Sequence, residues 1–307
     1  MKYNRLILSP KILGLMILIT GTILYSCKKQ KIDDLGALPK ADFTINPGAN
    51  GNSVVLINTT ATPAIAYWAV PGLNLTTKDL KGDTARLHFI FMGTYPVTLY
   101  VAGHGGLDSI TKTVTIAQND PSACNGTAIG FLTNCGTKKW KLDPAPAAYK
   151  VGPGADDGSW WSNNAGDVGA RYCEFNDEYN FTFNASGDFV YDNKGDYYSD
   201  GYIGTSPTNS CQVNSQLPAS QAAWASGNFH YTLLNGGSAG LGQLKVIGFG
   251  AHIGLQKVTN GGEVTVPTGT SVTYDILSMT HNAGGYDLIK LGANLGWGWW
   301  TFRLRSY

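Results

Sequence analysis

The strongest constraint on the fold is an alternation of apolar and polar residues in short runs. Leu87-Phe89-Phe91 and Val97-Leu99-Val101 each repeat with a period of two. That period places the apolar side chains on one face of a β-strand, whereas an amphipathic helix needs them three and four residues apart. Glycine-rich stretches such as Gly103-His104-Gly105-Gly106 separate the runs, and glycine is typical of tight turns. The sequence therefore predicts an all-β protein without long helices.

The first forty residues differ from the rest and predict export and lipid attachment. Lys2, Arg5 and Lys11 accompany an apolar run over residues 12–24, and Leu24-Tyr25-Ser26-Cys27 resembles the lipobox of bacterial lipoproteins. An ordinary transmembrane anchor is the alternative, but the run is shorter than the roughly 20 residues that span a bilayer. We expect a signal peptide over residues 1–26, a lipidated Cys27, and a flexible tether over residues 27–40.

The tether also bears on localisation. It reads Lys28-Lys29-Gln30-Lys31-Ile32-Asp33-Asp34, and lysine followed by acidic residues loosely resembles the surface-export signal of lipoproteins in glycan-foraging Gram-negative bacteria. Ile32 interrupts that pattern. We expect a protein anchored to the outer membrane by lipid and facing the cell exterior, with the periplasmic face as the alternative. Charged residues make up 14% of the chain and the net charge is +1, which disfavours a nucleic-acid partner.

The cysteines agree with an oxidising compartment. Once Cys27 is assigned to lipid, an even set of four remains, and disulfides are the favoured interpretation. Three pairings are possible, of which the most local joins Cys124 to Cys135 and Cys173 to Cys211. A zinc site is the alternative, but the chain has no Cys-x-x-Cys spacing.

Turn-rich and proline-containing residues 118–123 divide the mature chain into two predicted domains, residues 41–117 and 124–307. In the first, Ala41-Asp42-Phe43, Trp68, Gly93-Thr94-Tyr95-Pro96-Val97-Thr98-Leu99 and the segment 111–116 resemble the immunoglobulin-like PKD module of secreted and surface proteins. That family usually carries Trp-Asp-Phe-Gly-Asp-Gly where this chain continues Trp68-Ala69-Val70-Pro71-Gly72-Leu73. The resemblance implies an Ig-like sandwich that spaces or presents another domain, with Trp68 in its core.

The second domain also reads as strands. Tyr179-Phe181-Phe183 and Phe189-Tyr191 flank Asn184-Ala185-Ser186-Gly187-Asp188, which is turn chemistry for a β-hairpin. Strand periodicity with glycine-rich connections predicts a jelly-roll-like β-sandwich, an architecture common among carbohydrate-binding modules. Fold alone does not assign function.

Two tryptophan clusters are the candidate binding sites. Sugar rings present flat C–H faces, and an indole offers a flat partner with a polar N–H. In the last strand, alternation assigns Trp300, Phe302 and Leu304 to the core. It places the other set on the opposite face, namely Trp297, Trp299, Thr301, Arg303 and Arg305. The alternative is that the tryptophans are structural. The predicted ligand contacts are Trp160, Trp161, Asn163, Trp297, Trp299 and Arg303.

A wider resemblance supports that prediction. Trp140-Lys141-Leu142-Asp143-Pro144, residues 151–154 with Trp160-Trp161, residues 173–183 and residues 298–304 look like the C-terminal module of PKD-containing lipoproteins from polysaccharide-utilisation systems. A similar module is appended to some secreted β-glucan hydrolases. The resemblance implies surface capture of a polysaccharide, such as the β-glucan laminarin, beside an outer-membrane glycan importer or surface hydrolase. It does not fix which residues bind.

Catalysis and metal binding have less support. Glu174, Asp177 and Glu178 form a dense acidic cluster, but their spacing differs from the Glu-x-Asp-x-x-Glu stretch of laminarinase-like hydrolases. We therefore expect a non-catalytic protein without a cofactor, apart from a structural Ca²⁺ for which Asp192 and Asp196 are candidates. The alternatives are an adhesion or assembly protein that binds another outer-membrane protein, and a glycoside hydrolase with an unrecognised carboxylate pair.

Overall fold

The computed structural model describes residues 36–71 and 81–307, which form two compact units. Unit 1 comprises the described residues up to Phe89 together with Gly93–Ala117, and unit 2 comprises Ile90–Met92 and Gln118–Tyr307. The predicted signal peptide, Cys27 and most of the tether lie outside the described residues. No helix within the described ranges is long and apolar enough to cross a membrane.

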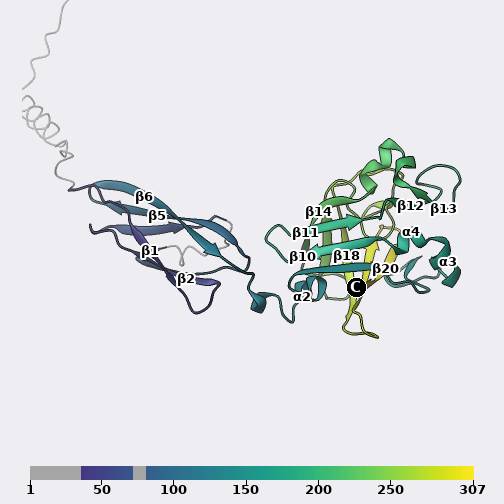
Figure 1. Ribbon diagram of the computed structural model, residues 1–307, viewed down its shortest axis with the longest axis horizontal. Coiled ribbons are helices and arrows are strands. Elements are labelled where there is room, and N and C mark those ends of the chain that lie inside the picture. The colour runs from purple at the N-terminus through teal and green to yellow at the C-terminus, as the bar shows by residue number, and fades with distance from the viewer. Residues whose placement is uncertain (1–35, 72–80) are drawn as a thin grey trace, which may run out of the picture. The chain divides into compact units, whose positions relative to one another are not determined.

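Unit 1 is a sandwich of two three-stranded antiparallel sheets (Figure 1). Trp68 is fully buried between them, its ring meets that of Phe43 edge-on at 5.1 Å, and its indole Nε1 donates a hydrogen bond of 2.8 Å to the Gly82 carbonyl. The prediction of a core tryptophan is confirmed. One sheet has the order β1 (Phe43–Pro47), β2 (Ser53–Asn58), β4 (Thr84–His88), and the other has the order β3 (Ile65–Ala69), β5 (Gly93–Gly103), β6 (Gly106–Ile116).

Unit 2 is built around eight antiparallel strands that close into a barrel. Each strand pairs with the next one in this series along the chain, and the last, β20, pairs with both β19 and the first strand, β7. Two short strands, β8 (Tyr149–Gly152) and β9 (Trp161–Ser162), continue the sheet beside β20. The eight strands are β7 (Thr137–Leu142), β10 (Glu178–Thr182), β11 (Asp188–Asp192), β14 (Gly227–Leu234), β15 (Gln243–Ile247), β18 (Ser271–Thr280), β19 (Leu288–Asn294) and β20 (Trp299–Ser306).

The all-β prediction is confirmed for both units, with only short helices present. The strand order of unit 2 is nevertheless up-and-down, whereas a jelly roll has the crossing connections of Greek keys. Strand periodicity determines which face of a strand is buried but not which strands are neighbours. The long connections here leave the barrel and return to the adjacent strand.

Apolar side chains fill the barrel, as expected for eight strands. A segment from the β15–β18 connection packs among them, with Ile253 and Leu255 buried in the same core as Phe302. The Tyr179 hydroxyl accepts a hydrogen bond of 3.1 Å from the Gly254 N–H. Gly254 has φ +74°, and a Cβ there would lie 2.2 Å from a ring carbon of Phe302. Glycine alone fits this position.

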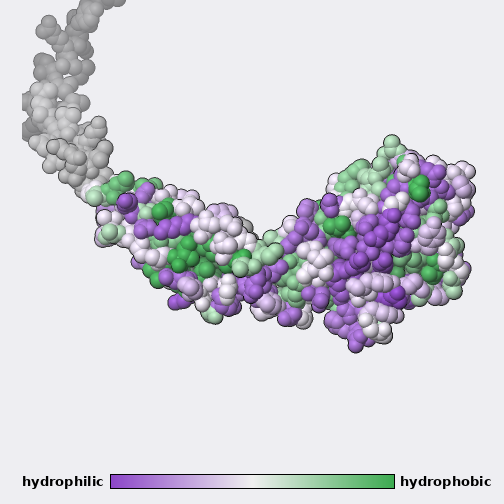
Figure 2. Space-filling view, viewed as in Figure 1, coloured by the Kyte–Doolittle hydropathy of each residue, from purple (hydrophilic) through white to green (hydrophobic). Residues whose placement is uncertain are grey.

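The connections carry the remaining short elements and both disulfides. Cys124 pairs with Cys135 and Cys173 with Cys211, with Cα separations of 5.5 and 5.8 Å, so the expectation of disulfides is confirmed in the local pairing. The face of unit 2 seen in Figure 2 is largely hydrophilic. The short elements are α2 (Ala128–Thr133), α3 (Ala165–Ala170), α4 (Tyr172–Phe175), β12 (Asp196–Ser199), β13 (Ser210–Val213), β16 (Val258–Thr259), β17 (Gly262–Glu263), and 3₁₀ turns at Pro121–Ala123, Asn214–Gln216 and Ala219–Trp224.

Candidate functional site: an indole-lined cavity

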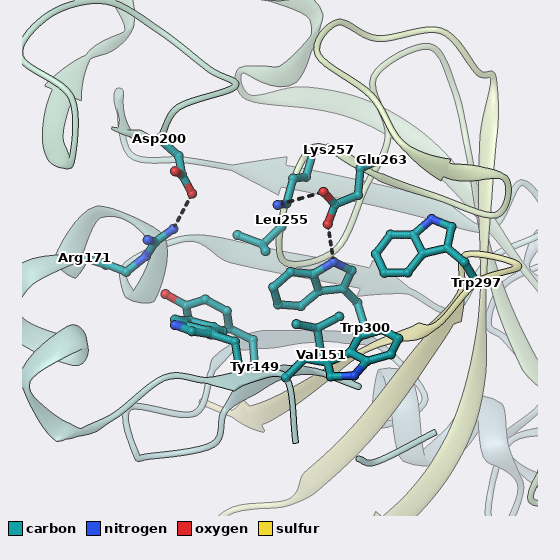
Figure 3. Close-up of a pocket in the computed structure, with 11 residues that line it drawn as sticks. Tyr149, Val151, Arg171, Asp200, Leu255, Lys257, Glu263, Trp297 and Trp300 are labelled. Atoms are coloured by element: carbon teal, nitrogen blue, oxygen red, sulfur yellow. Dashed lines mark hydrogen bonds and ion pairs between the residues drawn. The ribbon is translucent and has the colours of Figure 1, made fainter. Parts of the chain in front are cut away.

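Unit 2 contains a cavity of about 430 Å³ lined by four of its tryptophans (Figure 3). They come from the connection that enters β9, from β9 itself, from the turn between β19 and β20, and from β20. Tyr149 and Val151 of β8 and Leu255 of the inserted segment complete the less polar part of the lining. The four tryptophans are Trp160, Trp161, Trp297 and Trp300.

Trp160 and Trp297 form a stacked pair at the cavity. Their ring centroids lie 5.8 Å apart with an interplanar angle of 24°, and they are 51% and 55% exposed. Gly298 makes room for this arrangement, because a Cβ there would lie 2.5 Å from the Trp160 ring and 3.0 Å from the Gly152 carbonyl oxygen. The pair therefore offers exposed indole surface in a defined geometry.

Trp161 and Trp300 form a second aromatic group. The Trp161 ring lies 5.3 Å from Tyr149 and 6.0 Å from Trp300. Trp300 stacks on the buried Phe302 at 6.1 Å, which connects the cavity wall to the barrel core. Its Nε1 donates a hydrogen bond of 2.6 Å to Glu263 Oε1. Packing and a hydrogen bond thus hold Trp300, and Trp161 packs against it at the cavity wall.

One ion-pair group in the cavity is centred on Arg171. Its guanidinium donates to both carboxylate oxygens of Glu174, at 2.6 and 2.9 Å, and lies 3.5 Å from Asp200 Oδ2. The Tyr149 hydroxyl donates to Glu174 Oε2 at 3.1 Å. Burial raises the pKa of the Glu174 carboxyl, and the hydrogen bonds from Arg171 oppose that rise. The positive charge of Arg171 thereby stabilises the ionised Glu174 carboxylate, which has little access to water.

A second ion pair joins Lys257 to Glu263. The Lys257 ammonium lies 3.0 Å from Glu263 Oε2, while Glu263 Oε1 accepts from Trp300. The same ammonium lies 5.3 Å from the Trp300 ring centroid, within the range of a cation–π contact. In the view of Figure 3 the two ion pairs lie on either side of Leu255. The cavity thus combines flat aromatic surfaces with donors and acceptors of hydrogen bonds.

Three of the predicted contacts, Trp160, Trp161 and Trp297, line the cavity, but Trp299 does not. Trp299 points to the other side of β20, where its ring lies close to Gly292 of β19. Trp300, which alternation assigned to the core alone, reaches the cavity although it is only 5% exposed. Trp297 precedes β20 and lies in the turn that leads into it, so its place in the cavity does not follow from the alternation of that strand.

Asn163 and Arg303 do not line the cavity, and each holds a chain segment in place. Asn163 is buried, accepts from the Tyr149 N–H at 3.1 Å, and donates to the Ala145 carbonyl at 3.1 Å. Arg303 donates to Asp143 at 2.7 Å and to the Pro146 carbonyl at 3.2 Å. Asn163 therefore acts indirectly, by positioning the backbone of the cavity residue Tyr149.

Nothing in the sequence marked the charged residues of the cavity as neighbours of the tryptophans. Arg171, Asp200, Lys257 and Glu263 come from three connections of the barrel, with Lys257 and Glu263 both in the one between β15 and β18. None of the four was a predicted ligand contact. Only their neighbourhood in the folded chain brings them together. A buried tryptophan needs an acceptor for its N–H, but that requirement alone does not identify Glu263.

The side chains of the acidic cluster have partners within the protein. Asp177 is buried and accepts a hydrogen bond of 2.8 Å from the Tyr191 hydroxyl, and burial raises its pKa well above the usual range. Glu178 lies 2.9 Å from Lys139, 3.3 Å from Lys141 and 2.8 Å from Lys194. Although burial opposes ionisation, these lysines lower the pKa of Glu178 to about 2. Neither carboxyl lines the cavity.

The two calcium candidates have partners within the protein. Asp192 forms an ion pair of 2.7 Å with Lys194, and Asp196 Oδ2 accepts from Asn176 Nδ2 at 3.3 Å. Within residues 36–71 and 81–307, no group of three or more His, Cys, Asp or Glu side chains is arranged to hold a metal ion.

Comparison with known proteins gives a partial likeness. No protein-family model matches the sequence, and no curated protein matches it. Among solved structures, the chain is similar to the PKD1 domain of Vibrio anguillarum Epp, with 18% identity over 27% of this chain and 96% of that one, at a TM-score of 0.23. It is also similar to the PKD1 domain of the Vibrio cholerae metalloprotease PrtV, with 23% identity over 27% of this chain and all of that one, again at 0.23. This likeness to PKD domains carries no information about activity.

Proposed function

We propose that this protein is a non-catalytic glycan-binding protein that holds a polysaccharide through the indole-lined cavity of unit 2. The observation that carries the proposal is the combination of four tryptophans with two ion pairs in one cavity. Indole faces suit the C–H faces of sugar rings. The ion pairs supply charged hydrogen-bonding groups, which bind hydroxyls more strongly than neutral groups do.

The size of the cavity limits how much of a polysaccharide enters it. Its volume of about 430 Å³ lies at the lower end of the range for small-molecule sites. A short stretch or an end of the polymer would occupy it, and the exposed Trp160–Trp297 pair would support the units next to it. A β-glucan such as laminarin is the first candidate, on the resemblance of the sequence to modules of polysaccharide-utilisation systems.

The predicted lipid at Cys27 completes the proposal. It would anchor the protein to the outer membrane, facing the exterior, with unit 1 as a spacer and a glycan importer or surface hydrolase as the neighbour that receives the polymer. No bond-breaking role is assigned, since the two carboxylates that line the cavity, Asp200 and Glu263, each lie in an ion pair.

Affinity electrophoresis tests the proposal. The protein from Lys28 onward retains every described residue and would run through native gels containing laminarin, mixed-linkage β-glucan, xylan or mannan. We expect one polysaccharide to retard it, and we expect Trp160→Ala or Trp297→Ala each to weaken that affinity about fivefold, as for an aromatic contact of about 1 kcal/mol.

Phe249→Ala is the matched control, because Phe249 is 56% exposed and does not line the cavity. It should bind as the unmodified protein does. Equal affinity of the tryptophan variants and the parent would reject the cavity as the site. Free migration through every gel, together with a co-purifying outer-membrane protein, would instead favour the adhesion or assembly alternative.

A further inference from the structure

The charges of the cavity are balanced within the protein, and this bears on the kind of glycan it accepts. The described residues that line it include two cations and two carboxylates, and each cation lies within 3.5 Å of a carboxylate oxygen. Glu174, directly behind Arg171, adds a further carboxylate. We propose that the cavity selects uncharged glycans over those that carry carboxylate, sulfate or phosphate groups, and that Asp200 and Glu263 impose this selectivity. The inference rests on the proposed function and specifies its ligand class.

Glu263 is positioned to accept hydrogen bonds from a neutral sugar. One of its oxygens accepts from Trp300 Nε1 and the other lies 3.0 Å from the Lys257 ammonium. A carboxylate offers about four acceptor positions, so each oxygen keeps capacity for a ligand hydroxyl. The Lys257 ammonium has three donors and stands beside that carboxylate. The pair presents a donor next to an acceptor, which matches two neighbouring hydroxyls of a sugar.

Asp200 and Arg171 present a similar combination from another part of the lining. Arg171 is held by two hydrogen bonds to the buried Glu174, and its contact with Asp200 is longer, at 3.5 Å. The Asp200 side chain is 31% exposed. Asp200 Oδ1 accepts a hydrogen bond of 2.7 Å from the Gly201 N–H. Because a carboxylate offers about four acceptor positions, Asp200 keeps capacity to accept from a ligand.

Hydroxyls and anions differ in how they meet such pairs. A hydroxyl both donates and accepts, so it can bond to either member of an ion pair. An anionic group accepts only, and to reach Lys257 or Arg171 it must approach Glu263 or Asp200 as well. Repulsion between like charges is strong where water is excluded, and breaking an existing ion pair leaves a carboxylate uncompensated. Both effects disfavour an acidic glycan.

A two-part panel tests the inference on the protein from Lys28 onward. Native gels would contain either uncharged polymers (laminarin, mixed-linkage β-glucan, xylan, mannan) or anionic ones (polygalacturonate, alginate, chondroitin sulfate). We expect retardation only among the uncharged polymers, and an affinity that changes less than twofold between 50 and 500 mM NaCl, since screening has no net charge attraction to weaken. Stronger retardation by an anionic polymer would overturn the inference while leaving glycan binding intact. Migration unaffected by any polymer would overturn the proposed function itself.

A charge-removing variant adds a gain-of-binding test. Asp200→Asn combined with Glu263→Gln keeps side-chain size and leaves the two cations of the lining without those partners. We expect this variant to bind laminarin at least tenfold more weakly, because hydrogen bonds to charged groups are lost, and to acquire retardation in polygalacturonate. Asp188→Asn at the start of β11 is the control, since Asp188 lies outside the cavity and should leave both behaviours unchanged. A folded double variant with the parent's preference for neutral polymers would contradict the assigned role, and the wild-type panel and its salt dependence remain decisive if the variant does not fold.

Discussion

Replacing Gly298 by alanine tests whether the geometry of the tryptophan pair matters, because it removes no indole. The new methyl group would lie 2.5 Å from the Trp160 ring. Carbon atoms pack at about 3.5 Å or more, so the ring must move by roughly 1 Å. The ring centroids of Trp160 and Trp297 lie 5.8 Å apart at 24°, and a displacement of this size disturbs both their stacking and the surface that they offer.

The expected effect on stability is small. Trp160 is half exposed, so its ring can yield into solvent. The Gly152 carbonyl oxygen, 3.0 Å from the added carbon, needs to shift by only a few tenths of an ångström. Replacing glycine by alanine also lowers the entropy of the unfolded chain, which offsets about 0.4–1 kcal/mol. The net change should remain within about 1 kcal/mol, or roughly 2–4 °C in Tm for a unit of this size.

The expected effect on binding is larger than the effect on folding. If the stacked pair contributes about 1 kcal/mol to contact with a sugar, its disruption lowers affinity about fivefold. Isothermal titration calorimetry with laminarin, or with whichever polymer the gels identify, would measure the change, and thermal unfolding would follow stability in parallel. Gly154→Ala is the control, because nothing lies within 4 Å of a Cβ at that position.

Parent-like affinity of a folded Gly298→Ala protein would refute the reasoning. The arrangement of Trp160 and Trp297 would then have no part in binding. A loss of affinity shared with Gly154→Ala would instead indicate a general effect of stiffening the surrounding connections.

Three further predictions concern stability. The pKa of Glu178 is lowered from 4.5 to about 2, so the stability that its ionised form contributes is present above pH 4.5 and is lost as the pH falls toward 2. In urea titrations at a series of pH values, Glu178→Gln should lose less unfolding free energy on acidification than the parent does. The difference should be up to about 2 kcal/mol, since the lysines around Glu178 are partly exposed. Burial lowers the pKa of His252 from 6.5 to about 4. Because the unfolded chain then binds a proton that the folded protein does not, the free energy of unfolding should fall by up to about 3 kcal/mol as the pH drops from 6.5 to 4. His252→Phe should flatten this dependence, and an unchanged pH dependence would contradict a buried neutral histidine. Gly254→Ala should destabilise the protein by roughly 2–5 kcal/mol, from the positive φ and the overlap with Phe302, whereas Gly261→Ala, which meets no atom within 4 Å, should unfold like the parent.

Local features of this protein were predictable from its sequence. Alternation identified Phe181 and Phe189 as buried strand residues, and their stacked rings lie 4.7 Å apart on paired strands. The turn that joins these strands was predicted from its residue types. The sandwich core around Trp68 follows from the same period. These features depend on residues close together in the chain, where side-chain direction and turn geometry dominate.

Features that depend on distant segments were not predictable in this way. The pairing of Leu142 with Leu304 closes the barrel, and no periodicity within either strand specifies its neighbour. The alternation of the last strand was extended back to Trp297, although the regular strand begins only at Trp299. The ion pairs of the cavity arise from connections whose paths are set by packing against the barrel, and single residues such as Asp200 carry no local signature of that path.

The hydrogen bonding of β20 to both β7 and β19 has a consequence for how the protein reaches its folded state. Until β20 arrives, β7 and β19 each present an unpaired edge, and such edges can pair with another chain. Residues 137–142 must therefore wait for residues 299–306, a long-range contact that slows folding. This requirement is met only when the last strand of the chain is available, so unit 2 should fold late and in one step. Removal of β20 would leave the edges of β7 and β19 unpaired, and such a truncated chain should aggregate through them.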